Sequence, residues 1–148
     1  MKYFAYGSNL DAAQMAERCS DSKVICVARL QGYCLKFDRY SDGWGCGVAD
    51  IVREQGSEVW GLLYEISERD RYALDRYEGH PRLYRRIEVD VFDNANQKYC
   101  ALSYEVVRKD GHIAPSSEYL RILLNAAKKY AFPQHYQEFL INQEFLGT

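Results

Sequence analysis

This sequence lacks the features that mark membrane-bound, secreted and nucleic-acid-binding proteins. It has no apolar run near the length that spans a membrane, and no charged segment followed by an apolar stretch that would form a signal peptide. It also has no basic block, and its formal net charge is −2, so nucleic acid is not expected as a partner. We therefore expect a cytoplasmic protein that binds neither membranes nor nucleic acid.

Paired cysteines are absent as well. The five cysteines are odd in number and include no Cys-x-x-Cys motif, which argues against a disulfide framework and against a zinc site. We expect reduced, buried thiols that act as small apolar groups. The three histidines lack the spacing of metal ligands, so no metal is expected.

The remaining composition is that of a globular protein. The chain has 148 residues, of which 47% are hydrophobic, and this predicts a single domain over residues 1–148 with a sizeable core. Its thirteen tyrosines are unusual. Because a tyrosine buries an apolar ring but keeps a hydroxyl that needs a partner, we expect many in the core and a few in a pocket.

Alternating apolar residues and turn signals predict about six or seven strands and four helices. One pair of strands is expected over 46–53 and 58–66, joined through Gln55-Gly56-Ser57. A second hairpin is expected over 83–92 and 97–107. The predicted fold class is α+β, a small mixed and mostly antiparallel β-barrel flanked by helices.

The N-terminal segment carries the most informative pattern. A short strand over 2–6 enters the turn Gly7-Ser8-Asn9, and a helical pattern over 11–19 follows. Asp11 is the expected N-cap, and Gln14 stands where a capping box would have its second member. Free turn N–H groups and the positive end of the helix dipole would then converge on one point. The segment therefore predicts an anion pocket.

Neither a nucleotide site nor a serine nucleophile is supported by this turn. Gly7 lacks the spaced glycines of a nucleotide-binding loop, and Ser8 lies outside a Gly-x-Ser-x-Gly motif.

Glu78 is the carboxylate with the most unusual local setting. It ends a predicted helix that Ser67 begins and Gly79 stops, so the helix dipole and Asp75 both disfavour its charge. These two effects supply about 1 kcal/mol, whereas a base with a pKa near 7 needs roughly 3–4 kcal/mol. Burial must provide the rest. The alternative is an exposed glutamate at a helix end, and Arg82, Arg85 or Arg86 would lower its pKa if they faced it.

Several segments match one family in order along nearly the whole chain. They are Tyr3-Phe4-Ala5-Tyr6-Gly7-Ser8-Asn9-Leu10, Cys26–Leu30, Gly47–Ile51, Glu58–Gly61, Leu74–Gly79, Leu83-Tyr84 and Ala114–Tyr119. With these segments the sequence resembles the gamma-glutamylcyclotransferase-like (AIG2-like) family.

The resemblance implies a reaction without metal or cofactor. The α-amine of a small gamma-glutamyl substrate attacks its own γ-carbonyl, 5-oxoproline forms and the amine leaves. Glu78 would act as general base and then as general acid. The turn would hold either the α-carboxylate or the developing oxyanion. The implied substrate-binding residues are Tyr3, Phe4, Ala5, Tyr6, Gly7, Ser8, Asn9, Leu10, Tyr84 and Tyr119.

Several alternatives stay open at this point. Tyr119 fits the apolar stripe of a helix as well as a pocket wall. The substrate could instead be a gamma-glutamylamine or a gamma-glutamyl secondary metabolite, or the chain could bind a small carboxylate without catalysis. Arg82 or Arg86 could favour an acidic leaving amine. The resemblance makes glutathione a less favoured substrate, since glutathione-specific relatives typically carry Tyr-Gly-Ser-Leu, and the sequence leaves a homodimer open.

Overall fold

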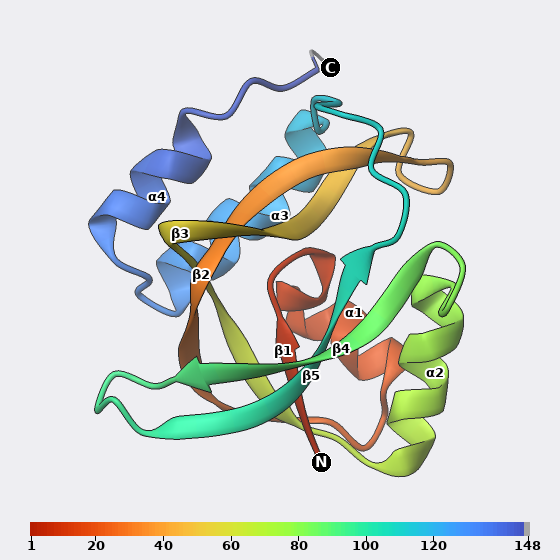
Figure 1. Ribbon diagram of the computed structural model, residues 1–148, viewed down its shortest axis with the longest axis vertical. Helices are drawn as coiled ribbons and strands as arrows, with labels where there is room; N and C mark the ends of the chain where they lie inside the picture. Colours follow the sequence, from red (N-terminus) through yellow and green to blue (C-terminus); the bar gives the residue numbers. More distant parts are fainter. Residues whose placement is uncertain (147–148) are drawn as a thin grey trace.

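A computed structural model describes residues 1–146, in which five strands form a closed barrel (Figure 1). The barrel order is β1-β3-β2-β4-β5. Neighbouring strands pair antiparallel except β1 and β5, whose parallel pairing closes the barrel. The predicted mixed, mostly antiparallel barrel is confirmed. The strands are β1 (Lys2–Ala5), β2 (Lys23–Ser41), β3 (Cys46–Glu65), β4 (Tyr84–Phe92) and β5 (Lys98–Val106).

Helices flank the barrel in two groups. The C-terminal helices α3 and α4 pack together on one side, and α1 and α2 lie near the N-terminal strand (Figure 1). Across residues 1–146, no helix combines the length and apolar character needed to cross a membrane. The helices are η1 (Ser8–Leu10, a 3₁₀ turn), α1 (Ala12–Arg18), α2 (Glu68–Glu78), α3 (Ser117–Lys129) and α4 (Gln134–Ile141).

The predicted hairpin over 46–53 and 58–66 is wrong, because both segments belong to the single long strand β3. Gly56 has φ +87° and lies near Gly32 of β2, which has φ +79°. Pairing between the strands stops after Gln31↔Glu58 and resumes at Tyr33↔Arg53. Since glycine adopts positive φ without a Cβ clash, both strands bend here without ending. The turn residues therefore mark a bulge within a strand.

Strand β1 packs so closely on β3 that it fixes the start of the N-terminal turn. A Cβ atom on Gly61 of β3 would lie only 2.1 Å from the carbonyl oxygen of Ala5. The side chains of Phe4 and Ala5 are fully buried in the core. The segment after β1 consequently leaves the barrel from an anchored position.

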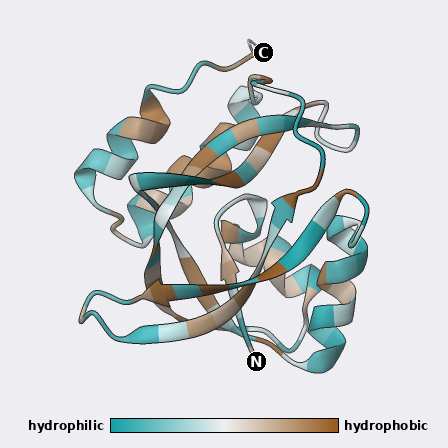
Figure 2. Cartoon of the chain, viewed as in Figure 1, coloured by the Kyte–Doolittle hydropathy of each residue, from teal (hydrophilic) through white to brown (hydrophobic). Residues whose placement is uncertain are grey.

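Helix α2 has the predicted ends. Ser67 accepts a hydrogen bond from the Asp70 amide (3.1 Å), and Asp70 accepts one from the Ser67 amide (3.2 Å), which completes a capping box. Gly79 ends the helix with φ +68°. The helix is mostly hydrophilic (Figure 2), and only Asp70 and Leu74 are buried. It therefore covers the barrel edge with one narrow face and presents Glu78 at its C-terminal end.

The cysteines only partly follow the prediction. Cys19 and Cys46 are buried, Cys26 and Cys34 are half-buried, and Cys100 is exposed. The expectation of buried thiols is wrong for Cys100, because its position on β5 faces away from the core.

Candidate active site

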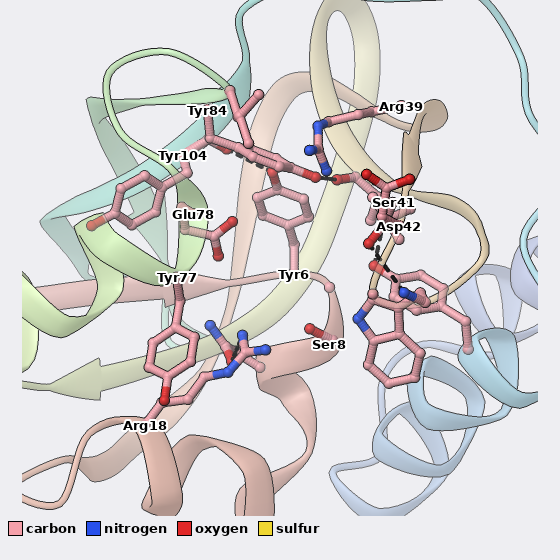
Figure 3. Close-up of a pocket in the computed structure, with 18 of the residues that line it drawn as sticks. Tyr6, Ser8, Arg18, Arg39, Ser41, Asp42, Tyr77, Glu78, Tyr84 and Tyr104 are labelled. Atoms are coloured by element: carbon pink, nitrogen blue, oxygen red, sulfur yellow. Dashed lines mark hydrogen bonds between the residues drawn. The ribbon is translucent and has the colours of Figure 1, made fainter.

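A cavity of about 610 Å³ opens where the N-terminal turn, the β2–β3 turn, the end of α2 and the start of α3 meet (Figure 3). Most of the predicted site residues line it, although they come from segments far apart in the sequence. Those predicted residues are Tyr3, Tyr6, Gly7, Ser8, Asn9, Glu78, Tyr84 and Tyr119.

Glu78 points from the end of α2 into this cavity, near Tyr6 and Tyr104 (Figure 3). Although the residue keeps some solvent exposure through the cavity, protein atoms surround its carboxyl group. This desolvation raises its pKa to about 7, against the opposing charges of Arg18 and Arg39. A carboxyl group with that pKa exchanges a proton readily at neutral pH. The alternative of an exposed glutamate at a helix end is therefore excluded.

Contrary to the prediction, Asp75 does not contribute to the raised pKa of Glu78. Its carboxylate accepts a hydrogen bond from the Tyr104 hydroxyl (2.6 Å) and forms ion pairs with Arg71 (3.3 Å) and Arg86 (2.5 Å). These partners compensate its charge, and Asp75 is absent from the groups that shift Glu78. Burial thus raises the pKa of Glu78 without the contribution from Asp75 that the sequence spacing indicated.

The arginines that follow Glu78 in the sequence do not face it. Arg86 is engaged by Asp75, and Arg85 pairs with Glu105 at 2.5 Å. Arg82 is exposed and lies outside the cavity lining. The structure gives no support to the hypothesis that Arg82 or Arg86 favours an acidic leaving amine, since neither residue lines the cavity.

The N-terminal turn is organised differently from the prediction. The 3₁₀ turn η1 separates Gly7 from α1, and the Asp11 side chain caps α1 by accepting a hydrogen bond from Ala13 N (3.0 Å). The Asp11 carboxylate therefore offsets the positive end of the α1 dipole and occupies one of the free N–H groups that the sequence assigned to a ligand anion. Gln14 does not complete a capping box and instead donates to Ser8 Oγ at 2.8 Å.

Side chains hold the turn in place from several directions. Asn9 donates to the Tyr3 hydroxyl (3.0 Å), and its backbone carbonyl accepts from the Tyr64 hydroxyl (3.0 Å). The Asn9 side-chain oxygen accepts from Gln14 (3.0 Å) and from Arg18 (3.2 Å). Such a network of buried hydrogen bonds makes the turn a rigid wall of the cavity.

Two arginines supply the positive charge that the helix dipole does not. The Arg18 guanidinium lies 4.5 Å from the centre of the Tyr77 ring, and that of Arg39 lies 5.5 Å from the centre of the Tyr84 ring. Both line the cavity, and neither forms a salt bridge with a carboxylate of residues 1–146. The cavity therefore holds two guanidinium groups without a carboxylate partner in this part of the chain, beside the carboxyl groups of Asp42, Glu78 and Glu118.

The backbone of Ala49 ties two wall tyrosines together. The Tyr84 hydroxyl donates to the Ala49 carbonyl (2.9 Å), and the Tyr119 hydroxyl accepts from the Ala49 amide (3.0 Å). Trp44 packs edge-on against Tyr119, with ring centres 5.1 Å apart. Tyr119 is 3% exposed, so it belongs to the core and to the cavity wall at once. Both sequence interpretations of Tyr119 therefore hold.

Comparison with known proteins identifies the family. The AIG2-like family model matches residues 58–140. Gamma-glutamylcyclotransferases of Mus musculus and Homo sapiens are each 34% identical over 141 residues, which cover 92% of this chain and 74% of each relative. A solved structure of a gamma-glutamyl cyclotransferase superposes with a TM-score of 0.93 at 32% identity, covering 99% of this chain and 89% of that chain.

The chain belongs to the gamma-glutamylcyclotransferase family. This membership places it in a class of enzymes and confirms the resemblance seen in its sequence.

In this gamma-glutamylcyclotransferase-family chain, three residues of the N-terminal motif do not line the cavity. Phe4, Ala5 and Leu10 are buried behind the turn. The expectation that they contact a ligand is corrected: they anchor the turn, because β1 is buried on both faces and the 3₁₀ turn buries Leu10. Among residues 1–146, no group of three His, Cys, Asp or Glu side chains is arranged to hold a metal ion.

Other residues that line the cavity of this family member were not predicted from the sequence. Arg18 lies at the end of an ordinary amphipathic helix, and Arg39 lies in a strand where charge carries no motif. Tyr104 falls on β5 with no signal beyond its ring. Only the tertiary structure brings these side chains beside Glu78. The missed residues include Arg18, Arg39, Trp44 and Tyr104.

Replacing Tyr119 by Phe is expected to lower the stability of the fold. The change leaves the buried Ala49 amide without its acceptor, which costs about 1–3 kcal/mol. Chemical denaturation measures this loss, with Tyr72→Phe as the control because Tyr72 is 60% exposed. Equal stability of both variants would mean that the Ala49 amide does not depend on Tyr119.

Proposed function

We propose that this protein is a gamma-glutamylcyclotransferase that converts gamma-glutamyl amino acids to 5-oxoproline and the free amino acid. The γ-carbonyl and the α-amine of the substrate react within one molecule, so the protein contributes no nucleophile. The single observation that carries the proposal is the carboxyl group of Glu78 in a cavity that is rich in tyrosine and arginine, with its pKa raised to about 7.

Glu78 performs the proton transfers in the proposed mechanism. As a carboxylate it takes a proton from the substrate α-ammonium, and the freed amine forms a bond to the γ-carbonyl carbon. As an acid it gives that proton to the amide nitrogen, and the bond between this nitrogen and the γ-carbon breaks as the carbonyl re-forms. The regenerated carboxylate then takes the second proton of the ring nitrogen and passes it to the departing amine, which leaves as an ammonium. General acid–base catalysis of this kind supplies typically 10²–10⁴-fold in rate.

The turn and Arg18 bind the glutamyl end of the substrate in this proposal. Arg18 already contacts the turn through the Asn9 side chain at 3.2 Å. A guanidinium beside Ser8 and Asn9 forms a suitable site for the α-carboxylate, since charge-assisted hydrogen bonds are the strong ones. Fixing this end orients the α-amine toward Glu78.

Positioning is the larger part of the proposed rate enhancement. An extended glutamyl chain must bend until its amine approaches its own γ-carbonyl, and correct orientation can supply as much as roughly 7–11 kcal/mol. The rigid walls formed by Tyr6, Tyr84 and Tyr119 support this role, because their hydroxyls are held by the backbone carbonyls of Tyr104 and Ala49 and by the Ala49 amide. The cavity thereby selects a curled substrate.

Incubation of the purified protein with gamma-glutamyl-alanine tests this function. We expect 5-oxoproline and alanine in equal amounts, measured by mass spectrometry. No product from a panel of gamma-glutamyl amino acids and gamma-glutamylamines would contradict an enzymatic role and leave a carboxylate-binding protein. Product from the amines alone would assign the substrate to the gamma-glutamylamine class.

A further inference from the structure

We propose that Arg39 binds the carboxylate of the departing amino acid and thereby restricts the enzyme to gamma-glutamyl amino acids over gamma-glutamylamines. This inference rests on the proposed function, because it concerns the leaving side of the same substrate. It replaces Arg82 and Arg86, which lie outside the cavity lining.

The charges of the cavity match those of a gamma-glutamyl amino acid. At neutral pH this substrate carries two carboxylates and one ammonium. The cavity holds two guanidiniums, Arg18 and Arg39, and the carboxyl group of Glu78. A gamma-glutamylamine carries only one carboxylate, so it would leave one guanidinium without a counter-charge. The two further carboxylates at the cavity, Asp42 and Glu118, are exposed, and solvent screens them.

Strand register directs Arg39 into the cavity. Phe37 pairs with Ala49 and Arg39 pairs with Val48, so Asp38 is an extra residue that forms a bulge in β2. Paired residues of neighbouring strands project from the same face, and Val48 lines the cavity as well. Without the bulge, Asp38 would occupy this position and Arg39 would not.

The bulge is anchored in the protein interior. The Asp38 side chain is buried and faces Asp50, which is fully buried. Asp50 in turn accepts hydrogen bonds from Val106 N (2.8 Å) and Lys109 Nζ (2.7 Å). The backbone carbonyl of Asp38 also accepts from Asp110 N at 2.9 Å. The position of Arg39 is therefore built into the fold.

Arg39 and Arg18 have different neighbours, which separates their roles. Arg18 is tied to the turn through Asn9, whereas Arg39 stacks on Tyr84 beside the β2–β3 turn. The two guanidiniums enter the cavity from different sides, with Tyr6 between them in the view of Figure 3. With the α-carboxylate at the turn, the departing amino acid extends toward the remaining guanidinium, that of Arg39.

Two substrates that differ only in the second carboxylate test the inference. Gamma-glutamyl-alanine and gamma-glutamyl-ethylamine share the same carbon skeleton apart from that group. We expect the wild type to favour the alanine substrate by about 10- to 100-fold in kcat/KM, since a hydrogen bond to a charged group has about this strength. The difference should lie in KM, because the distant carboxylate is bound equally before and during the reaction.

Arg39→Gln should lower kcat/KM for gamma-glutamyl-alanine and reduce the preference between the two substrates to within about threefold. Arg18→Gln is the matched control, and it should affect both substrates alike because both carry the α-carboxylate. The ratio between substrates on one protein preparation cancels any loss of folded enzyme.

Four outcomes would overturn the inference. Equal wild-type activity on both substrates, or an Arg39→Gln preference that stays as large as that of the wild type, removes the role of Arg39 while leaving the proposed function intact. Loss of the preference in Arg18→Gln alone would assign the leaving carboxylate to Arg18. Absence of turnover for both substrates would instead contradict the proposed function, and the inference with it.

Discussion

Glu78→Gln should lower kcat for gamma-glutamyl-alanine by about 10²–10⁴-fold, because the amide can neither accept the proton of the α-ammonium nor return it to the leaving nitrogen. KM should change little, since the turn and the arginines bind the substrate. Release of 5-oxoproline by wild type and variant measures the effect. Full activity of Glu78→Gln would remove Glu78 from the mechanism.

The pH dependence of the wild type provides a second readout of the same prediction. The base must be ionised, and the pKa of Glu78 is raised to about 7. We therefore expect kcat/KM to rise about tenfold per pH unit below pH 7 and to level off above it. Glu88→Gln is the control variant, because Glu88 is exposed on β4 and outside the cavity, and it should keep both the rate and the profile.

Glu78→Gln should also make the folded protein more stable than the wild type above pH 7. The pKa of Glu78 is about 7 in the folded protein, against 4.5 for an unperturbed glutamate. A carboxyl group whose folded pKa is raised favours folding in its protonated form, and this contribution is lost as pH rises through 7. At pH 8, ionised Glu78 costs the wild type about 3 kcal/mol. Glu78→Gln avoids this cost.

Thermal denaturation at several pH values measures the difference. The gap between Glu78→Gln and wild type should be near zero at pH 4 and roughly 6–12 °C in Tm at pH 8. Asp38, whose pKa is also raised to about 7 by burial, titrates in both proteins and cancels in the comparison. Parallel curves for the two proteins from pH 4 to pH 8 would contradict burial of Glu78 as the cause of its raised pKa. Glu88→Gln should show no such gap.

The two expected results together would indicate that the candidate site is maintained at a cost in stability. A carboxyl group desolvated enough to exchange protons at neutral pH destabilises the fold whenever it ionises. The enzyme would gain stability and lose activity from one substitution, which a purely structural glutamate would not do.

Local patterns in the sequence were sufficient to predict the helices and strands whose ends carry strong capping or turn signals. Ser67 and Gly79 predicted both ends of α2, and the two runs over 83–92 and 97–107 predicted the hairpin of β4 and β5. The same kind of signal was misleading at Gly56, where a glycine bends β3 within a long strand. Glycine occurs both in turns between strands and in bulges within a strand, and only the pairing of β3 with β2 distinguishes the two cases here.

In the candidate site as well, local sequence patterns predicted some features and the tertiary structure decided the others. The sequence indicated Glu78 and the N-terminal turn, because a helix end and a strand–turn–helix pattern are local. It attributed the positive charge to a helix dipole, whereas Arg18 and Arg39 provide it. These arginines carry no motif, and their positions depend on the orientation of α1 and on the bulge at Asp38.

The N-terminal segment itself shows what each level of structure decides. The sequence by itself determined that β1 ends at a turn, that a capped helix follows and that the chain resembles the gamma-glutamylcyclotransferase family. The tertiary structure alone decided that the carboxyl group of Glu78, far along the chain, is desolvated beside this turn and that its pKa is raised to about 7. The physical reason is that desolvation depends on every atom packed around a group, and closing the barrel assembles those atoms from distant segments.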